Sequence, residues 1–543
     1  MAGPFVAPAR RAVCSRATIM KQPRALLSDP FAIVFAIVLL VSLFPIWTVR
    51  YHPLPDLANH MAASAVWVHL YDPNWYFARY YELSLGLNPY WGYYAPMRVL
   101  APLLGIDIAN RVVLSIYAIA LPLGTTWLAL RFDKSRWIGL FAFPFIWTFS
   151  FTLGFIHTSL GLALVPGAVA AFDWYCERPS IRRGIIAVLL GVAVYFCHIV
   201  PFLLYIGCAG LVGLFYRDRS LRQIAARLAV WCSTFGIGLL VSLLGHGKGM
   251  GTTPGHYTFS WDPHPIALML HIYDWTWNNC VGHEDEYLAA LLATGWLALC
   301  LSVRPRFSRS LHDYRAHACV FAAIAGYIIL PKSVLTPSYS WGVKYRIAAW
   351  ALLFLAYLIP GQISGWRRLF LIPVVIAGLG FAIDADIHWR TANALTAGFD
   401  EATAVIPSAA RPLFILGKPF RDPAVAQGYV QSWPSYYQAR RGSYNPGLFD
   451  DFPIHFRERF PAPTWQTMVF NWEQHAPYYD YVVTFQKTGA SVFQQHLSAV
   501  VAVKTVGNWT VWKLPGPRVD VPPGPAYPGA WAYDPNWRPI VKP

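Results

Sequence analysis

Long apolar runs recur along this chain, and short clusters of arginine and lysine separate them. A helix of about 20 apolar residues is long enough to cross the hydrocarbon core of a bilayer. Only 13% of the 543 residues are charged, against about 25% in an average soluble chain. The sequence therefore predicts a polytopic α-helical membrane protein with about eleven transmembrane helices. The predicted spans are 31–49, 108–130, 137–153, 158–175, 184–199, 201–216, 228–245, 287–303, 316–331, 345–360 and 369–384.

The basic clusters predict how these spans are oriented, because cytoplasmic loops carry an excess of Lys and Arg. Eleven spans place the basic N-terminus, residues 1–30, on the same side as the arginine-rich connections, so this side is predicted to be cytoplasmic. Loops 50–107 and 246–286 of the transmembrane domain, residues 31–384, then lie outside. We expect a multi-pass protein of the bacterial inner membrane. The net charge of +16 is spread over many connections, and no nucleic-acid-binding module is recognisable, so no nucleic-acid partner is predicted.

Residues 385–543 predict a separate soluble domain outside the membrane. A helical pattern covers 391–405, and strand-like runs rich in Val, Ile, Phe, Tyr and Trp follow it. The predicted strands are 412–416, 481–485, 499–503 and 509–512. Helices and strands together indicate an extracytoplasmic α/β domain. The tail from Pro515 is rich in Pro and Gly and is predicted to be extended.

Asp56 follows the first span by a few residues, and His60 follows Asp56 by about one helical turn. A carboxylate at the membrane boundary costs free energy and commonly marks a functional site. It could therefore act as a general base. Asp56 could instead be the N-cap of a helix that begins near Pro55, because Asp is favoured at that position. The two roles could also coexist.

Further polar side chains gather at the predicted outer face of the membrane. They are Arg98 in the first outer loop, His157 and His198 at the ends of spans, and Lys332, Lys344 and Arg346 before the tenth span. Cations at this level suit a phosphate group. The alternatives are that the histidines are structural contacts between helices and that the cations extend towards lipid headgroups. The aromatic residues of loop 50–107 could form an interfacial belt or a surface on which a sugar stacks.

This combination predicts the transfer of a sugar from a lipid phosphate to an acceptor hydroxyl. A carboxylate would take the proton of the hydroxyl while its oxygen attacks the anomeric carbon. Cations would stabilise the departing lipid phosphate, with a divalent metal ion as an open alternative. No nucleotide site is required, because the energy lies in the bond between sugar and phosphate, and no cofactor is certain. The sequence has no Gly-rich phosphate loop for a nucleotide.

Segments 54–60, 154–161, 195–198 and 344–346 resemble the C-type (GT-C) superfamily of polytopic membrane glycosyltransferases, and most closely its uncharacterised bacterial members. The resemblance implies a polyprenyl-phosphate sugar donor, a glycan or lipid acceptor, and a catalytic acid in the first outer loop. One feature departs from this pattern. Many members carry paired acidic residues in that loop, whereas Asp56 is alone, with Asp72 and Glu82 distant in sequence.

The polar residues and the resemblance together give a working hypothesis for the roles of the residues named above. Asp56 and His60 are the predicted catalytic residues, with Asp56 as the base. Lys344 and Arg346 are predicted to bind the donor phosphate, assisted by Arg98 or Lys332. The remaining histidines, His157 and His198, would orient the substrates.

Two other classes of function stay open. A transporter or lipid flippase would also place polar groups in the membrane, although near the midplane and with internal repeats. A non-catalytic membrane scaffold would use the outer domain to bind a partner. Within loop 246–286, the density of His, Asp and Glu leaves a metal site open, and the glycines between 245 and 255 predict a mobile lid.

Overall fold

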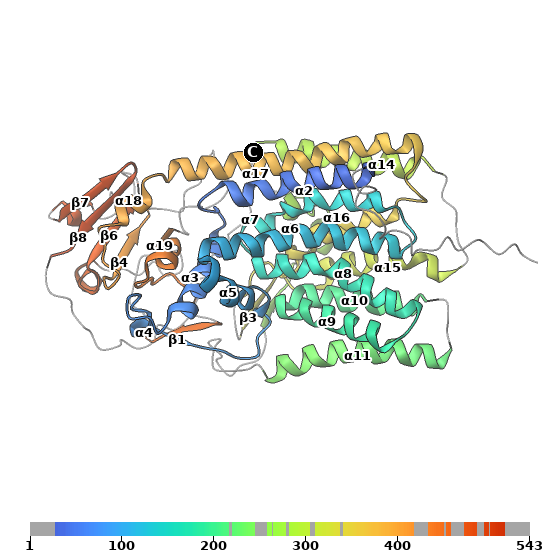
Figure 1. Cartoon of the computed structure of the whole chain (residues 1–543), viewed down its shortest axis with the longest axis horizontal. Coiled ribbons are helices and arrows are strands. Elements are labelled where there is room, and N and C mark those ends of the chain that lie inside the picture. Colours follow the sequence, from blue (N-terminus) through green and yellow to red (C-terminus); the bar gives the residue numbers. More distant parts are fainter. Residues whose placement is uncertain are drawn as a thin grey trace, which may run out of the picture.

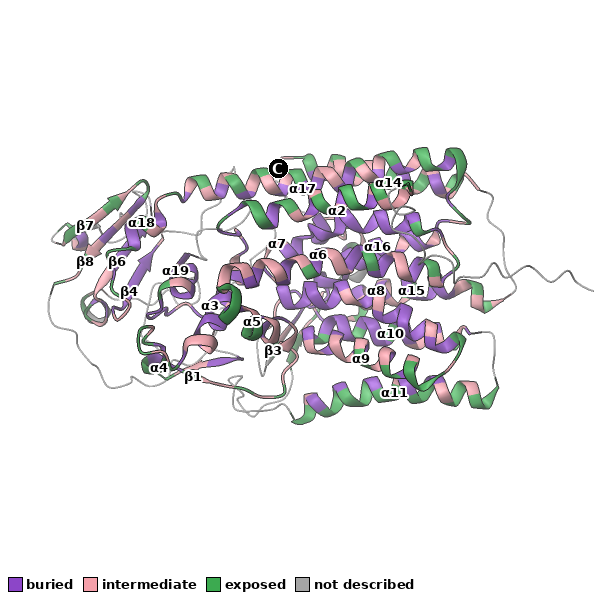
Figure 2. Cartoon of the chain, in the orientation of Figure 1, coloured by how far each residue is buried: buried purple, intermediate pink, exposed green. Residues whose placement is uncertain are grey.

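The computed structural model describes residues 28–216, 220–244, 258–262, 264–277, 282–303, 310–336, 340–416, 433–449, 452–457, 472–485, 494–498 and 500–515. Long helices lie side by side in a bundle, and a smaller part that contains the strands covers one end of it (Figure 1). Figure 2 shows that α8 (Ile156–Glu177) is buried within the bundle, whereas α11 (Leu221–Leu244) lies largely exposed at its edge.

Every predicted span overlaps a helical segment of the bundle. Among the residues that the structure describes, five segments are long and apolar enough to cross a membrane, namely 30–48, 106–131, 156–177, 221–244 and 365–403. The chain is therefore a polytopic α-helical membrane protein, as predicted. Besides α8 and α11, the bundle contains α2 (Pro30–Thr48), α6 (Ile106–Arg131), η2 (Arg136–Ile146), α7 (Phe149–Thr152), α9 (Ile181–Cys197), α10 (Ile199–Leu214), α14 (Glu284–Leu301), η3 (Leu311–Tyr314), α15 (Arg315–Ile329), η4 (Tyr345–Ile347), α16 (Ala348–Phe354), η5 (Leu355–Leu358), η6 (Gly365–Leu371) and α17 (Ile372–Leu395).

Two predicted spans are irregular. The third, 137–153, consists of the 3₁₀ helix η2 and the short helix α7, and the tenth, 345–360, consists of η4, α16 and η5. Irregular backbone at membrane depth needs partners within the protein, because lipid supplies none. Aromatic side chains provide them: Trp277 Nε1 donates to the carbonyl of Pro144 at 3.0 Å, and Trp296 Nε1 donates to that of Leu355 at 2.9 Å. The buried aromatic residues thus allow these short segments to lie inside the bundle.

The C-terminal region contains a four-stranded sheet in the order β4-β6-β8-β7. Strand β4 (Pro412–Ile415) is parallel to β6 (Tyr481–Phe485), and β8 (Trp509–Lys513) is antiparallel to both β6 and β7 (Val501–Val506). Each of these strands overlaps a predicted one, although β7 begins at 501 and ends at 506, where 499–503 was predicted. Helix α17 continues past the predicted boundary at 385 to Leu395, and α18 (Phe399–Thr403) then packs against β7 and β8.

The C-terminal region is not separate from the first outer loop. Strand β1 (Tyr81–Leu83) of the loop pairs antiparallel with β5 (Ile454–Phe456), and α3 (Pro55–His69) packs against α19 (Trp433–Arg441). The Ser435 hydroxyl donates to Asn59 Oδ1 at 2.7 Å, which joins the two helices. Loop and C-terminal region therefore form one unit at this end of the bundle, which we call the cap and define as the described residues of 50–105 and 396–515.

The aromatic residues of the first loop explain why the cap is a single unit. Tyr80, Tyr81, Tyr93 and Tyr94 are buried. The rings of Tyr81 and Phe456 lie 5.0 Å apart between centroids. These four tyrosines are therefore part of the hydrophobic core of the cap. They form neither an interfacial belt nor an open surface on which a sugar could stack. The sequence analysis missed this because the packing partners follow more than 300 residues later in the chain.

Shorter elements complete the described structure. They are α4 (Phe77–Tyr80), α5 (Trp91–Leu104), β2 (Thr258–Ser260), α12 (Pro265–Leu270), α13 (Asp274–Trp277), β3 (Ser333–Thr336), α20 (Trp472–His475), η8 (Ala476–Tyr478) and α22 (Gln494–Leu497). Strands β2 and β3 pair antiparallel. Residues 258–260 of loop 246–286 are therefore hydrogen-bonded to the segment before the tenth predicted span.

A two-point ion pair fastens the cap to the bundle and can be tested. Arg440 of α19 donates from Nε and Nη2 to the two carboxylate oxygens of Asp107 in α6, both at 3.0 Å, and lies 4.2 Å above the Tyr51 ring. Because the pair is only partly exposed, Arg440→Gln should lower the free energy of unfolding by about 2 kcal/mol. Thermal unfolding in detergent measures this. Arg441→Gln, a change at an exposed neighbour, is the control, and equal effects of the two variants would contradict the prediction.

Candidate functional site at the cap end of the bundle

Asp56 lies in the first turn of α3, not at its N-cap. Leu54 occupies the N-cap position and Pro55 the first helical position. The interpretation of Asp56 as an N-cap is therefore wrong, although a carboxylate in the first turn still interacts favourably with the helix dipole. Within the part of the chain that the structure describes, the Asp56 side chain accepts no hydrogen bond. Its electrostatic partner is Arg346.

A tight turn before α8 places the histidine of that helix next to α3. The backbone N–H of Asp56 donates to the Leu153 carbonyl at 3.2 Å. Gly154 has φ +86°, and a Cβ at this position would lie 2.6 Å from Leu57 N and 2.7 Å from Asp56 N. Only glycine allows both this conformation and this approach. The turn therefore determines the distance between α3 and the start of α8, where His157 lies.

His60 and His157 face each other across this junction. Their ring centroids are 4.5 Å apart, and His60 Nδ1 is hydrogen-bonded to the Tyr94 hydroxyl at 2.8 Å. His157 is 3% exposed, and neither of its ring nitrogens has a hydrogen-bond partner in the described structure. A buried polar group without a partner is costly. A hydroxyl group of a substrate bound here would satisfy it.

Arg346 lies in η4, within hydrogen-bond distance of two other bundle elements. Its Nη1 donates to Thr158 Oγ1 of α8 at 3.0 Å and lies 3.1 Å from Nε2 of His198. Its Nη2 donates to the Trp341 carbonyl at 2.8 Å. The guanidinium also lies 4.1 Å from the centre of the Phe155 ring. The buried Arg346 Nε has no partner among the described residues.

The contact between Arg346 and His198 has the character of an anion site. His198 is the N-cap of α10, and its Nδ1 accepts a hydrogen bond from Val200 N at 3.1 Å. A neutral imidazole that accepts at Nδ1 carries its proton on Nε2. Nε2 and the guanidinium are then two adjacent donors with no acceptor between them. An oxygen of a phosphate group could accept from both.

Burial sets the protonation states of the two residues on α3. It raises the pKa of Asp56 from its usual value near 4 to about 7, although the positive charge of Arg346 opposes the shift. It lowers the pKa of His60 to about 3, so this imidazole is neutral at physiological pH. A carboxylate whose pKa lies near the working pH is suited to act as a general base.

The other predicted phosphate-binding cations lie in different surroundings. Lys344 is buried, and its Nζ lies 3.3 Å from Asp262 Oδ2, so its charge is paired. Lys332 pairs through its backbone with Ser260 at the end of β2, and its side chain is partly exposed. Arg98 is exposed on α5. Its charge acts on His69 at the far end of α3.

The structure thus brings together five of the eight predicted site residues. These are Asp56, His60, His157, His198 and Arg346. Sequence reasoning did not assign Tyr90, the N-cap of α5, or Tyr94 of that helix to the site, although their ring centroids lie 4.8 and 4.9 Å from that of His157. Their spacing of four places both on one face of a helix, and this was the available signal.

The metal site and the mobile lid considered for loop 246–286 concern a segment that the structure describes only in part. Among the described residues of the chain, no group of three or more His, Cys, Asp or Glu side chains is arranged to hold a metal ion. The glycines between 245 and 255, on which the predicted lid rests, lie outside the described residues.

Comparison with solved structures identifies the fold of the chain. No family model matches the chain, and no curated protein matches it in sequence. Among solved structures, ArnT from Cupriavidus metallidurans bound to undecaprenyl phosphate is similar, with a TM-score of 0.50, 14% identity, and coverage of 91% of this chain and 99% of that one. The chain has a GT-C-like fold. The apo structure of the same ArnT matches with a TM-score of 0.46 and 12% identity, over 88% of this chain and 97% of that one.

The turn at Gly154 provides a test of the site geometry. Gly154→Ala places a Cβ against the backbone of α3 in a conformation that L-residues rarely adopt. We expect a loss of about 2 kcal/mol or more of stability, from the strained φ and the contact together. The measurement is thermal unfolding of the purified protein. Gly86→Ala, also in the outer loop, is the control, because its added Cβ would meet nothing within 4 Å. A Gly154→Ala protein as stable as that control would contradict the geometry.

Proposed function

We propose that the protein is a membrane glycosyltransferase that moves a sugar from a polyprenyl-phosphate donor to an extracytoplasmic acceptor. The observation that carries this proposal is the pair of buried donors, Arg346 and His198, together with the positive charge of Arg346, which acts on Asp56. An anion site beside a general base is what this transfer requires. The GT-C-like fold supports the proposal, since the similar ArnT structure holds undecaprenyl phosphate.

The donor phosphate would lie between Arg346 and the Nε2–H of His198. Asp56, ionised, takes the proton of an acceptor hydroxyl. The hydroxyl oxygen forms a bond to the anomeric carbon, while the bond from that carbon to the phosphate oxygen breaks. The electron pair leaves with the polyprenyl phosphate, and Arg346 stabilises its charge. Atoms and charges balance without a further reactant.

The neighbouring residues have supporting roles in this proposal. The neutral His60 and His157 orient hydroxyl groups of the substrates, because the unpartnered nitrogens of His157 can donate to one and accept from another. Lys344, whose charge Asp262 partly neutralises, and Lys332 contribute positive potential from the segment before η4. Arg98 has no role in binding the phosphate in this proposal, because this residue of α5 lies near His69, at the other end of α3 from Asp56.

The orientation in the membrane belongs to the same proposal. The N-terminus would be cytoplasmic, and the cap would lie on the other side of the inner membrane, next to the acceptor. The basic connections between spans support this orientation through the positive-inside rule.

Removing the proposed base tests the function. Asp56→Asn should lower the transfer of labelled sugar from polyprenyl-phosphate donors to envelope acceptors by about 10²–10⁴-fold. Asp72→Asn is the matched control, since Asp72 lies in the same loop but pairs with His69 and the backbone of Asn74. If both variants transfer sugar as wild type does, Asp56 is not the base. If the intact wild-type protein transfers nothing from a broad panel of donors, the proposed function is wrong.

The raised pKa of Asp56 predicts a pH profile. The base must be ionised, so kcat/KM for the donor, which reports the donor-free protein, should rise with pH, with a midpoint near the pKa of about 7. His60→Gln should lower the rate and keep the midpoint, because the pKa of His60, about 3, lies far below this range. A midpoint that disappears in the His60 variant would assign the titration to the histidine and contradict the account.

A further inference from the structure

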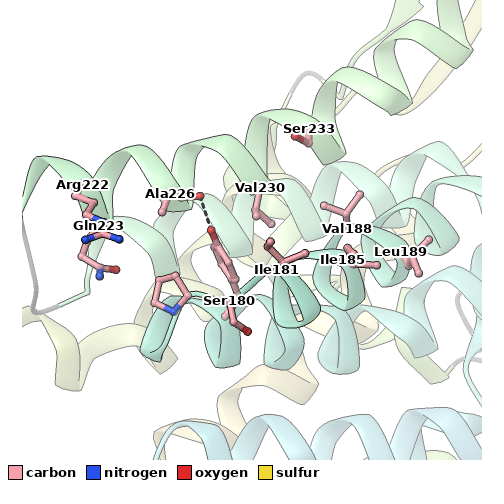
Figure 3. Close-up of a pocket in the computed structure, with 13 residues that line it drawn as sticks. Ser180, Ile181, Ile185, Val188, Leu189, Arg222, Gln223, Ala226, Val230 and Ser233 are labelled. Carbon is pink, nitrogen blue, oxygen red and sulfur yellow. Dashed lines mark hydrogen bonds between the residues drawn. The ribbon is translucent and has the colours of Figure 1, made fainter.

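A groove at the edge of the bundle lies outside the proposed catalytic site. It runs between α9 and α11, has a volume of about 630 Å³, and has part of α8 as its floor. Figure 3 shows Ile185, Val188 and Leu189 of α9 on one side of the groove and Val230 of α11 on the other. The Tyr175 hydroxyl of α8 donates its proton to the Ala226 carbonyl at 3.0 Å, so it is not available as a donor to a ligand in the groove. This part of the groove is apolar.

One end of the groove is polar. Ser180, Arg222 and Gln223 line it, at the start of α9 and α11 (Figure 3). Arg222 is exposed and has no ion pair or hydrogen bond from its side chain within the described residues. A guanidinium, an amide and a hydroxyl can all donate to phosphate oxygens. The polar end therefore complements an anionic headgroup.

The dimensions of the groove match one leaflet of a bilayer. From Ser180 to Leu189 the helix rises about 13 Å, close to half of the hydrocarbon thickness of about 30 Å. The catalytic candidate lies at the opposite end of the same helix, because His198 follows α9 directly. The helix is about 25 Å long. A ligand at Arg222 is therefore distinct from a phosphate at Arg346.

We propose that this groove binds an anionic glycerophospholipid of the cytoplasmic leaflet. Arg222, with Gln223 and Ser180, holds the phosphate, and one acyl chain lies along Val188 and Val230. The bound lipid fills the space between α9 and α11. It stabilises α11, which is buried over only a small part of its surface. The leaflet follows from the basic residues at this end of the bundle.

The test uses the purified full-length protein in detergent, titrated with dioleoyl phosphatidylglycerol and, separately, with dioleoyl phosphatidylcholine. Bound lipid is counted by native mass spectrometry, and the shift in Tm is recorded. Wild type should bind the anionic lipid more tightly and gain Tm from it. Arg222→Gln should weaken binding of phosphatidylglycerol about fivefold, the effect of one arginine at an anionic lipid surface, and change binding of phosphatidylcholine little.

The control is Arg182→Gln, which removes the same charge from an exposed position of α9 that does not line the groove. It should bind phosphatidylglycerol within twofold of wild type. Val188→Trp, which fills the apolar part, should reduce binding of both lipids while retaining a single peak in size-exclusion chromatography. The proposal is overturned if Arg222→Gln and Arg182→Gln act equally, if wild type does not distinguish the two lipids, or if a folded Val188→Trp protein keeps its lipid.

Discussion

A single buried guanidinium connects the parts of this protein that lie at the end of the bundle next to the cap. Arg346 donates to Thr158 at the start of α8 and to the carbonyl of Trp341, and it contacts His198 before α10. A charge in such a place is costly unless it has partners. The available partners satisfy it only in part, since its Nε has none in the described structure. This incomplete satisfaction is the reason why we propose an anion site at this position.

The electrostatics of Asp56 depend on the same residue. Burial favours the neutral acid, whereas Arg346 favours the carboxylate, and the balance leaves the pKa near neutrality. Binding of an anionic phosphate would cancel part of the charge of Arg346 and raise the proton affinity of Asp56. The carboxylate would then be a stronger base while the donor is bound than while it is absent. In the proposed mechanism, donor binding and proton transfer would thereby be linked through one electrostatic contact.

Much of the bundle could be predicted because membrane helices obey a simple rule of length and apolarity. The same rule cannot reveal that η2 and η5 are 3₁₀ segments, because their carbonyls depend on the indoles of Trp277 and Trp296 from distant parts of the chain. The strands of the C-terminal sheet were visible as runs of β-favouring residues. The pairing of β1 with β5 was not, since each has three residues and no local signal joins them.

The candidate site divides in the same way. Asp56 and His60 are one helical turn apart, so sequence alone predicts their shared face. The proximity of His157, His198 and Arg346 is tertiary, and only their common place at the outer ends of spans pointed to it. The positive charge of a residue did not by itself indicate which of the four predicted cations lies in the site. Lys344 is paired with Asp262, and the charge of Arg98 acts on His69. Neither contact could be predicted, because the sequence does not show which carboxylate or helix end each cation will meet.

The most direct test of the central claim is the affinity of the purified protein for undecaprenyl phosphate in wild type, Arg346→Gln and Arg98→Gln. The two variants remove the same charge, one at the proposed anion site and one on the exposed face of α5. The account predicts that Arg346→Gln weakens binding by about 10–100-fold, the contribution of a charge-assisted hydrogen bond in a buried site, and that Arg98→Gln binds within twofold of wild type. Equal affinities for wild type and a folded Arg346→Gln protein, or a larger loss for Arg98→Gln, would contradict it.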